Sequence, residues 1–259
     1  MAESGEEALK PEPRSWVDFD EALKILKKHR TEIPDPAEAP EQEGWLSGVK
    51  ILDLCNVIAG PHAASYLARF GAEVIKLEPS VPLYDSWNTV IYGISQMRGK
   101  KSILADMKSE HGRKVFEDLV KSVDVIIWNA PDSQIKRMGL DAENLRKLNP
   151  NALFCKLDCF SGVNRGVRTD YIGYDDLVQA ATGIMLRFGG AMDRPEEHAH
   201  VGTIDVMCGF GGALSVAAAL YQKYRFGRIG RGRTSLTANS GLLQIPMAYD
   251  YRGRGLFVE

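Results

Sequence analysis

Two hydrophobic periods follow one another in the first strongly apolar part of the chain and predict a strand, a helix and a second strand. The apolar run Val49–Leu54 is typical of a buried strand, and Ala63–Phe70 has the apolar spacing of an amphipathic helix. Gly71 ends that helix, and Glu73–Leu77 has the composition of another strand. A unit of about thirty residues in this order is the size of one parallel crossover. The turn Asn56–Pro61 presents main-chain N–H groups at the positive end of a helix, which suits an anionic ligand.

The same alternation of strands and helices continues along the chain. Further strands are expected at Ser102–Ala105, Asp124–Trp128, Ala152–Leu157 and Thr234–Leu236. Further helices are expected at Gly112–Val120, 142–149, Gly173–Leu186, Val206–Tyr224 and Asn239–Tyr249. Gly139 indicates a helix end, Asp141 is a good N-cap, and residues 80–90 are expected to form a loop. This order predicts an α/β fold, in which a parallel sheet carries helices on both faces.

Residues 1–45 differ from the rest of the chain and are typical of an arm. Apolar residues at 19–26 predict one short helix, and residues 32–44 form a Pro- and Glu-rich linker. Docking of this helix on a neighbouring domain or subunit and a loosely held tail are both compatible with the sequence. Residues 46–259 are expected to form the main domain.

Composition narrows the class of protein. Among 259 residues, 44% are hydrophobic and 25% are charged, which is ordinary for a globular domain. The net charge of -2 gives no electrostatic reason to expect nucleic acid. No apolar run approaches the roughly 20 residues that span a bilayer, so we expect no membrane partner. The acidic amino terminus lacks the apolar core of a secretory signal, and four widely spread cysteines favour buried, reduced thiols in a cytoplasmic protein.

Common nucleotide, hydrolase and metal motifs are absent from the sequence. There is no GxGxxG after the first strand, no GxxxxGK[ST], and no GxSxG or HExxH. Cys155 and Cys159 have a weak metal spacing, and His198 and His200 lie in a polar loop. We therefore expect no metal site.

Three features carry candidate chemistry instead. The basic cluster between Arg98 and Lys108 is compatible with a phosphate clamp or with a solvated charged loop. Arg137 follows a predicted strand end, where open α/β sheets place ligands. Asp205 is expected at the N-cap of the long apolar helix, where the helix dipole favours an ionised carboxylate. Such a carboxylate in a dry site can be a nucleophile, although a plain N-cap has the same sequence pattern.

Six separate segments, in order from about residue 46 to 250, carry a shared family pattern. They are LSGVKILDL…NVIAGPHAASYLARFGAEVIKLE, RGKKSILADMK, SVDVIIWN, IKRMGLDAENLRKLNPNALF, GYDDLVQAATG and IDVMCGFGGALSVAAAL…GRIGRG. Together they resemble the family III CoA-transferases, which include formyl-CoA transferase, carnitine CoA-transferase and alpha-methylacyl-CoA racemase. The motifs are specific for the family and not for a substrate.

The resemblance implies a Rossmann-like large domain, a homodimer of two interlocked ring-shaped subunits, and coenzyme A as the shared ligand. It implies that the Asp205 carboxylate is the nucleophile. The loop of Asn56, Val57, Ile58 and Ala59 would lie along the thiol and pantetheine end of CoA. Four further positions match CoA-contacting residues of the family: Lys108, Asn129, Arg137 and Met138.

The implied reaction moves CoA from an acyl-CoA to a small carboxylic acid and needs no metal or redox cofactor. Asp205 would attack the donor thioester and give a mixed anhydride and CoA thiolate. The thiolate would return to form an aspartyl-CoA thioester. The acceptor carboxylate would then attack, and a second anhydride would pass its acyl group to CoA.

Departures from the family pattern bear on the choice of reaction. The racemases have His where this chain has Tyr174 in the substrate region, and a phenol with a pKa near 10 is a poor acid–base partner. This favours a transferase over an acyl-CoA racemase or isomerase. Ile58 replaces a Gln and Pro79 an Arg of formyl-CoA transferase, which argues against formyl and oxalate as substrates.

The chain is shorter than family members, and we expect the C-terminal small domain that closes the ring to be missing. Three readings follow: a fragment, one half of a fused CoA-transferase/lyase of the dimethylsulfoniopropionate type, or a non-catalytic CoA-binding subunit. An interlocked homodimer or a fused second half would complete the fold in the first two cases.

Overall fold

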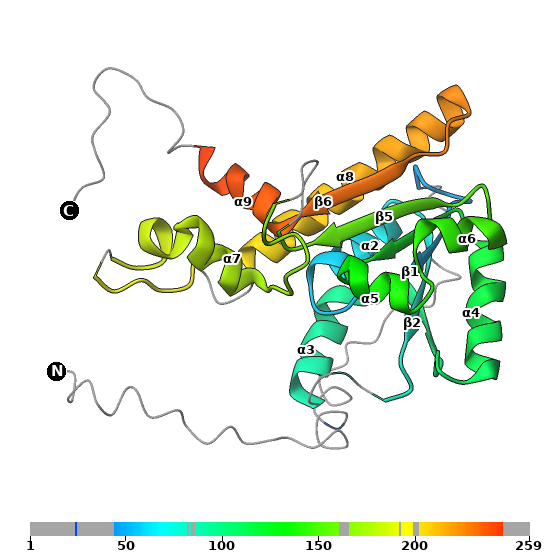
Figure 1. Ribbon diagram of the computed structural model, residues 1–259, viewed down its shortest axis with the longest axis horizontal. Helices are drawn as coiled ribbons and strands as arrows, with labels where there is room; N and C mark the ends of the chain where they lie inside the picture. The colour runs from blue at the N-terminus through cyan, green and yellow to red at the C-terminus, as the bar shows by residue number, and fades with distance from the viewer. Residues whose placement is uncertain are drawn as a thin grey trace.

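The computed structural model describes residues 24, 44–81, 83, 86–160, 166–191, 193–198 and 202–245. They form a six-stranded sheet with the order β3-β2-β1-β4-β5-β6, in which all neighbouring strands are parallel (Figure 1). The strands are β1 (Lys50–Asp53), β2 (Glu73–Glu78), β3 (Lys100–Leu104), β4 (Val125–Trp128), β5 (Leu153–Asp158) and β6 (Arg231–Ser235). This order confirms the expected Rossmann-like α/β fold.

Helices cover both faces of the sheet, as predicted. The helices are α2 (Ala59–Arg69), α3 (Ser86–Gln96), α4 (Glu110–Ser122), α5 (Asp132–Arg137), α6 (Ala142–Leu148), α7 (Asp175–Thr182), α8 (Thr203–Phe226) and α9 (Leu236–Leu243), with a π-helical turn η2 (Met185–Gly189). Successive side chains of β1 point to opposite faces, so Ile51 packs in the core under α2 and α8, and Leu52 in the core under α4 and α6.

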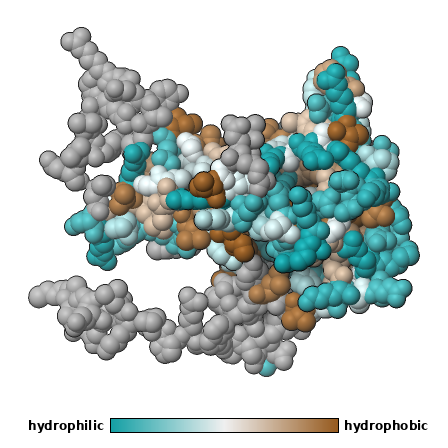
Figure 2. Space-filling view, viewed as in Figure 1, coloured by the Kyte–Doolittle hydropathy of each residue, from teal (hydrophilic) through white to brown (hydrophobic). Residues whose placement is uncertain are grey.

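The outer side formed by α4 and α6 is largely hydrophilic in Figure 2. Helix α4 begins at the Ser109 N-cap, whose hydroxyl accepts from the Gly112 N–H, and it turns Phe116 and Val120 toward the sheet. Its remaining positions are mostly charged, as expected for an amphipathic surface helix. Asp141 caps α6 as predicted, since its carboxylate accepts from the Glu143 and Asn144 N–H groups.

The loop expected over residues 80–90 is wrong in its second half, where α3 begins at Ser86. The segment contains β-branched residues and Gly93, which have low helix propensity, so the local pattern is weak. Tertiary contacts stabilise the helix instead. Gln96 at the end of α3 is buried, and its side-chain oxygen lies 2.9 Å from His62 Nδ1 on α2.

The carboxy-terminal elements also differ from their expected bounds. The helix predicted from Gly173 is the shorter α7, because Gly183 adopts φ +78 and ends it. Strand β6 begins three residues before the expected strand. Helix α9 follows it directly, because the Ser235 hydroxyl accepts from the Ala238 N–H and caps the helix.

Helix α8 is about half-buried: 44% of its apolar window lies inside the protein. Small residues bring it close to α2: a Cβ atom at Gly209 would lie 2.8 Å from His62 Cδ2, and one at Gly212 would lie 3.0 Å from Ala63 Cβ. Away from this contact, α8 exposes apolar side chains that include Leu214 and Tyr221. By length and composition alone, α8 is apolar enough to cross a membrane, yet here it packs on α2, β5 and β6.

Most of the predicted arm lies outside the described residues, which in this region are Lys24, Gly44 and Trp45. Trp45 stacks on Phe70 at the end of α2, with ring centroids 5.6 Å apart.

The α2–α8 contact predicts opposite effects of two Gly→Ala substitutions. Gly209→Ala should lower the free energy of unfolding by about 1–3 kcal/mol, because the new methyl would meet the Ala59 carbonyl oxygen at 3.0 Å as well as His62. Gly93→Ala in α3 meets nothing within 4 Å and should raise it by about 0.5–1 kcal/mol. Urea unfolding measures both, and equal effects of the two substitutions would contradict the close packing.

Candidate active site

The sheet reverses its winding between β1 and β4, which are neighbours although β2 and β3 come between them in sequence. Open α/β sheets bind ligands in the crevice at the carboxyl ends of the strands at this point. Two asparagines join the loops that follow these strands. Asn56 N–H donates to Asn129 Oδ1 at 2.9 Å, and Asn129 Nδ2 donates back to the Asn56 carbonyl oxygen at 2.6 Å.

A cavity of ≈250 Å³ lies in this crevice. The structure brings together six of the residues singled out from the sequence in its lining: Asn56, Val57, Ala59, Asn129, Tyr174 and Asp205. Sequence reasoning missed several other lining residues, which include Gln134, Asp158, Cys159, Thr169, Tyr171 and Cys208. These come from the end of β5, from helices α5 and α8 and from the segment before α7, and their spacing along the chain carries no signal of a shared cavity.

The β1–α2 loop is strained at Val57, whose φ is +66. A β-branched residue avoids this left-handed region, and such strain gathers at binding sites when the surrounding structure enforces it. The next residue, Ile58, is the N-cap of α2 and offers no side-chain cap to the helix. Ile58 is not part of the cavity lining. Its Cδ1 atom lies 3.1 Å from the position of a Cβ atom at Gly202, at the start of α8.

Asp205 is not the N-cap of α8, as the sequence indicated, but the third helical residue; Gly202 is the N-cap, at φ +66. The Asp205 side chain is buried, and the residue is only 7% exposed. Its main-chain N–H donates to Asp175 Oδ2 at 2.7 Å. The other Asp175 oxygen accepts from Gln179, which in turn accepts from the His198 N–H at 2.7 Å and so joins α7 to the segment before α8.

The structure also differs from the sequence-based expectation that a helix N-terminus keeps Asp205 fully ionised. Burial, and after it the nearby carboxylates of Asp175 and Asp176, together raise the pKa of Asp205 to about 7. Burial and like charge thus outweigh the helix N-terminus. Near neutral pH both protonation states of Asp205 are populated, and groups with such pKa values are frequent in active sites.

Three of the remaining predicted residues are exposed and are not part of the cavity lining. Lys108 follows β3 and is exposed; its main-chain N–H donates to Asp106 Oδ1. Arg137 and Met138 at the end of α5 are also exposed. Arg113 of α4 donates to the Met138 carbonyl oxygen at 2.8 Å, and this hydrogen bond joins α4 to the end of α5.

Other reactive groups near Asp205 are held in neutral form. Burial raises the pKa of the Cys159 thiol to about 12 and also raises the pKa of Cys208. Tyr174 precedes α7 and is 51% exposed, so its hydroxyl is accessible from the cavity mouth. Within the described ranges, His, Cys, Asp and Glu side chains form no group of three or more that could hold a metal.

The sequence profile described as CoA-transferase family III matches residues 46–256. The chain belongs to this family. Among curated relatives, the CoA-transferase/lyase DddD of Marinomonas sp. (strain MWYL1) is 50% identical over 261 residues, covering 98% of this chain and 31% of the relative. Succinate–glutarate CoA-transferase of Agrobacterium fabrum is 34% identical and is matched over 73% of this chain and 50% of its own length.

Solved structures agree with the family assignment. A CaiB/BaiF family protein from Brucella suis is 27% identical, with a TM-score of 0.71, over 80% of this chain and 57% of that chain. The chain thus spans between about a third and somewhat over half of the length of these relatives. The relatives named here are described as CoA-transferases or as a CaiB/BaiF family protein.

The Asn56–Asn129 contact predicts a stability effect. Asn129→Ala removes both hydrogen bonds between the loops and leaves main-chain groups of Asn56 unsatisfied, so the free energy of unfolding should fall by about 1–3 kcal/mol. The exposed Asn151→Ala is the control and should change it by less than about 0.5 kcal/mol. Equal urea midpoints for Asn129→Ala and the wild type would contradict the contact.

The raised pKa of Asp205 predicts a pH-dependent stability. The folded state holds the proton up to about pH 7, whereas the unfolded state loses it near its ordinary value of 3.8. Wild-type stability should therefore fall as pH rises through this window, and Asp205→Asn should not share the fall. The stability advantage of Asp205→Asn should grow by about 2–4 kcal/mol between pH 4 and pH 8 in urea unfolding. If the difference in the free energy of unfolding between Asp205→Asn and the wild type did not change with pH, the assigned pKa would be contradicted.

Proposed function

We propose that this chain carries the CoA-binding site and the nucleophile of an enzyme that moves CoA between an acyl-CoA and a carboxylic acid. The observation that supports it best is the position of Asp205, buried in one cavity with the strained loop around Val57. A carboxylate with a pKa near 7 in a cavity of this kind suits nucleophilic attack, because half of it is ionised at neutral pH and little water competes.

In the proposed mechanism, an Asp205 oxygen attacks the donor thioester carbon, and the C–S bond breaks to give a mixed anhydride and CoA thiolate. The thiolate attacks the aspartyl carbonyl, releases the donor carboxylate and leaves an aspartyl-CoA thioester. The acceptor carboxylate attacks this thioester, thiolate leaves again, and the thiolate takes the acceptor acyl group from the second anhydride. Asp205 is returned as a carboxylate, so atoms and charge balance without a metal.

In this proposal, two groups of residues bind CoA at different ends. Asn56, Val57, Ile58 and Ala59 lie along the pantetheine and thiol end, with Asn129 fixing the loop. Three exposed residues bind the phosphate-bearing end of the ligand, namely Lys108, Arg137 and Met138. The cationic side chains of Lys108 and Arg137 suit the phosphate groups of CoA.

The alternative of an acyl-CoA racemase or isomerase needs a second acid–base group beside Asp205. Tyr174 is the titratable side chain at the corresponding position, and a phenol is a weak base near neutral pH. The geometry therefore favours transfer.

A second proposal concerns the whole protein. The DddD relative is a CoA-transferase/lyase of which this chain matches 31%, over 98% of its own residues. We infer that residues 46–259 form the large domain and that a further segment, a second fused half or a partner subunit in an interlocked dimer completes the enzyme. Because the sequence also resembles fused enzymes of the dimethylsulfoniopropionate type, that carboxylic acid belongs in the substrate panel as an acceptor of CoA.

The mechanism predicts a covalent adduct at Asp205. The protein is incubated with a panel of acyl-CoAs, treated with hydroxylamine or borohydride, and examined by intact-protein and peptide mass spectrometry. A trapped adduct should map to Asp205 in the wild type and be lost completely in Asp205→Asn, because the amide is a poor nucleophile.

Asp176→Asn is the matched control, since Asp176 is an exposed aspartate close to the same site. It should retain the adduct. An adduct on another residue would overturn the role of Asp205, and CoA binding without any adduct would favour a racemase or a non-catalytic CoA-binding subunit.

A further inference from the structure

Asp175, the first residue of α7, is a second buried carboxylate beside Asp205. The residue is 5% exposed, and its Oδ2 atom accepts from the Asp205 main-chain N–H at 2.7 Å. Its Oδ1 atom accepts from the side-chain amide of Gln179, whose oxygen accepts from the His198 N–H at 2.7 Å. Asp175 therefore fixes the first turn of α8, where Asp205 lies, both to α7 and to the segment that precedes α8.

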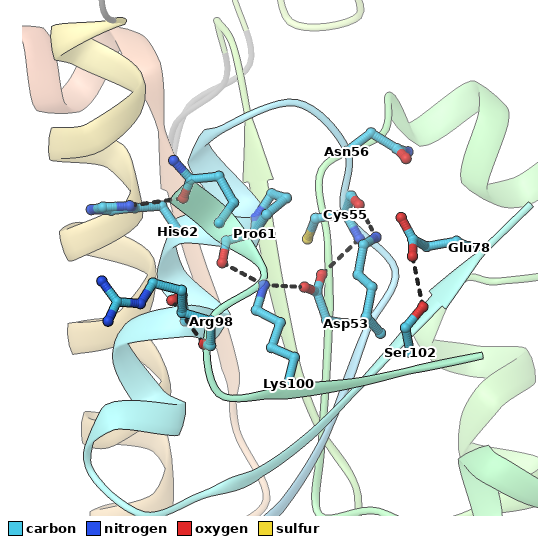
Figure 3. Close-up of polar contacts among 12 residues, drawn as sticks. Asp53, Cys55, Asn56, Pro61, His62, Glu78, Arg98, Lys100 and Ser102 are labelled. Carbon is cyan, nitrogen blue, oxygen red and sulfur yellow. Dashed lines mark hydrogen bonds and ion pairs between the residues drawn. The ribbon is translucent and has the colours of Figure 1, made fainter. Parts of the chain in front are cut away.

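The charge of Asp175 is not compensated in the way that the charge of Asp53 is. Asp53, at the end of β1, has no exposed side-chain surface and lies 2.7 Å from Lys100 Nζ, which also donates to the Pro61 carbonyl oxygen (Figure 3). Burial alone would raise the pKa of Asp53, but Lys76 and Lys100 outweigh it and lower this pKa below its ordinary value. In the part of the chain that the structure describes, no basic side chain forms an ion pair with Asp175.

The other titratable groups around Asp205 leave the carboxylates of α7 as the charges that act on it. Asp158 at the end of β5 lines the same cavity, but its charge is shared with Arg233, whose Nη2 atom lies 2.9 Å away. Burial keeps the neighbouring thiols neutral by raising their pKa, namely those of Cys159 and Cys208. Burial raises the pKa of Asp205 most, and the carboxylates of Asp175 and Asp176 follow in this order.

We propose that Asp175 is a positioning residue that orients Asp205 and, by its negative charge, makes that side chain a stronger nucleophile. This inference rests on the proposed function, in which Asp205 attacks the donor thioester. As the new C–O bond forms and the C–S bond breaks, the negative charge leaves with sulfur, so the repulsion between the two carboxylates is relieved. A carboxylate beside a like charge is also more basic, and a more basic oxygen attacks faster. Asp175 itself forms no covalent bond and transfers no proton.

The test is the pH dependence of acylation in the wild type and in Asp175→Asn. The rate of adduct formation is followed by intact-protein mass spectrometry between about pH 5 and pH 9, with an acyl-CoA of the panel that labels the wild type. The asparagine keeps an oxygen that accepts from the Asp205 N–H but carries no charge. The midpoint of the rate profile should therefore move down by about one pH unit. The rate above the midpoint should fall about threefold, because the nucleophile is less basic.

Two control variants and a second readout separate charge from structure. Asp176→Asn removes an exposed charge on the same helix and should move the midpoint by clearly less than Asp175→Asn. Asp175→Glu keeps the charge and should retain the wild-type midpoint. A ¹³C titration of side-chain carboxyl groups, with the Asp205 signal assigned by its loss in Asp205→Asn, should show the same shift without any acyl-CoA.

Three outcomes would count against the inference. An unchanged midpoint in Asp175→Asn, or an unchanged rate above it, would overturn the role of Asp175 and leave the transferase proposal standing. Loss of the native near-ultraviolet circular dichroism spectrum in Asp175→Asn would make Asp175 a structural residue and overturn the inference as well. Absence of any adduct in the wild type would overturn the proposed function and the inference with it, whatever the ¹³C titration showed.

Discussion

The close contact between α2 and α8 is the constraint on which the candidate site depends. Glycines on α8 let its backbone approach α2, so that the two helices run side by side over one face of the sheet (Figure 1). Their first turns then meet, with Ile58 beside Gly202. This places the loop after β1 and the carboxylate of Asp205 in one cavity, although about 150 residues separate them in the chain. A bulkier α8 would move Asp205 away from that loop.

Hydrophobic period and turn residues were sufficient to predict every strand and the parallel α/β architecture. They failed where tertiary contacts outweigh local preference: α3 contains Gly93 and β-branched residues, and its last residue, Gln96, contacts His62 of α2. The resemblance supplied the residues of the candidate site, and six of them do share the cavity. The ionisation of Asp205 was not predictable from position on a helix, because its pKa is set first by burial and then by carboxylates of α7, thirty residues earlier.

The features that destabilise the fold gather at the carboxyl edge of the sheet. Val57 is held in a left-handed conformation, Asp205 has a raised pKa, and Lys76 is a buried cation. The opposite is true of the two cores, where β1, β4 and β5 are almost completely buried by helices on both faces. The stability of these cores allows the loops above them to stay in conformations that the chain would otherwise avoid.

The pairing of β1 with β4 has a kinetic consequence. Ile51 pairs with Val125, and the elements α2, β2, α3, β3 and α4 lie between them in the chain. Contacts of such long sequence separation carry a large loop-closure entropy and are made late, whereas the β1–α2–β2 crossover is local. The asparagine link between the two loops can therefore form only after the sheet has grown on both sides of β1. A nascent or partly folded chain would contain the crossover unit but not the crevice, so ligand binding reports completion of the whole sheet.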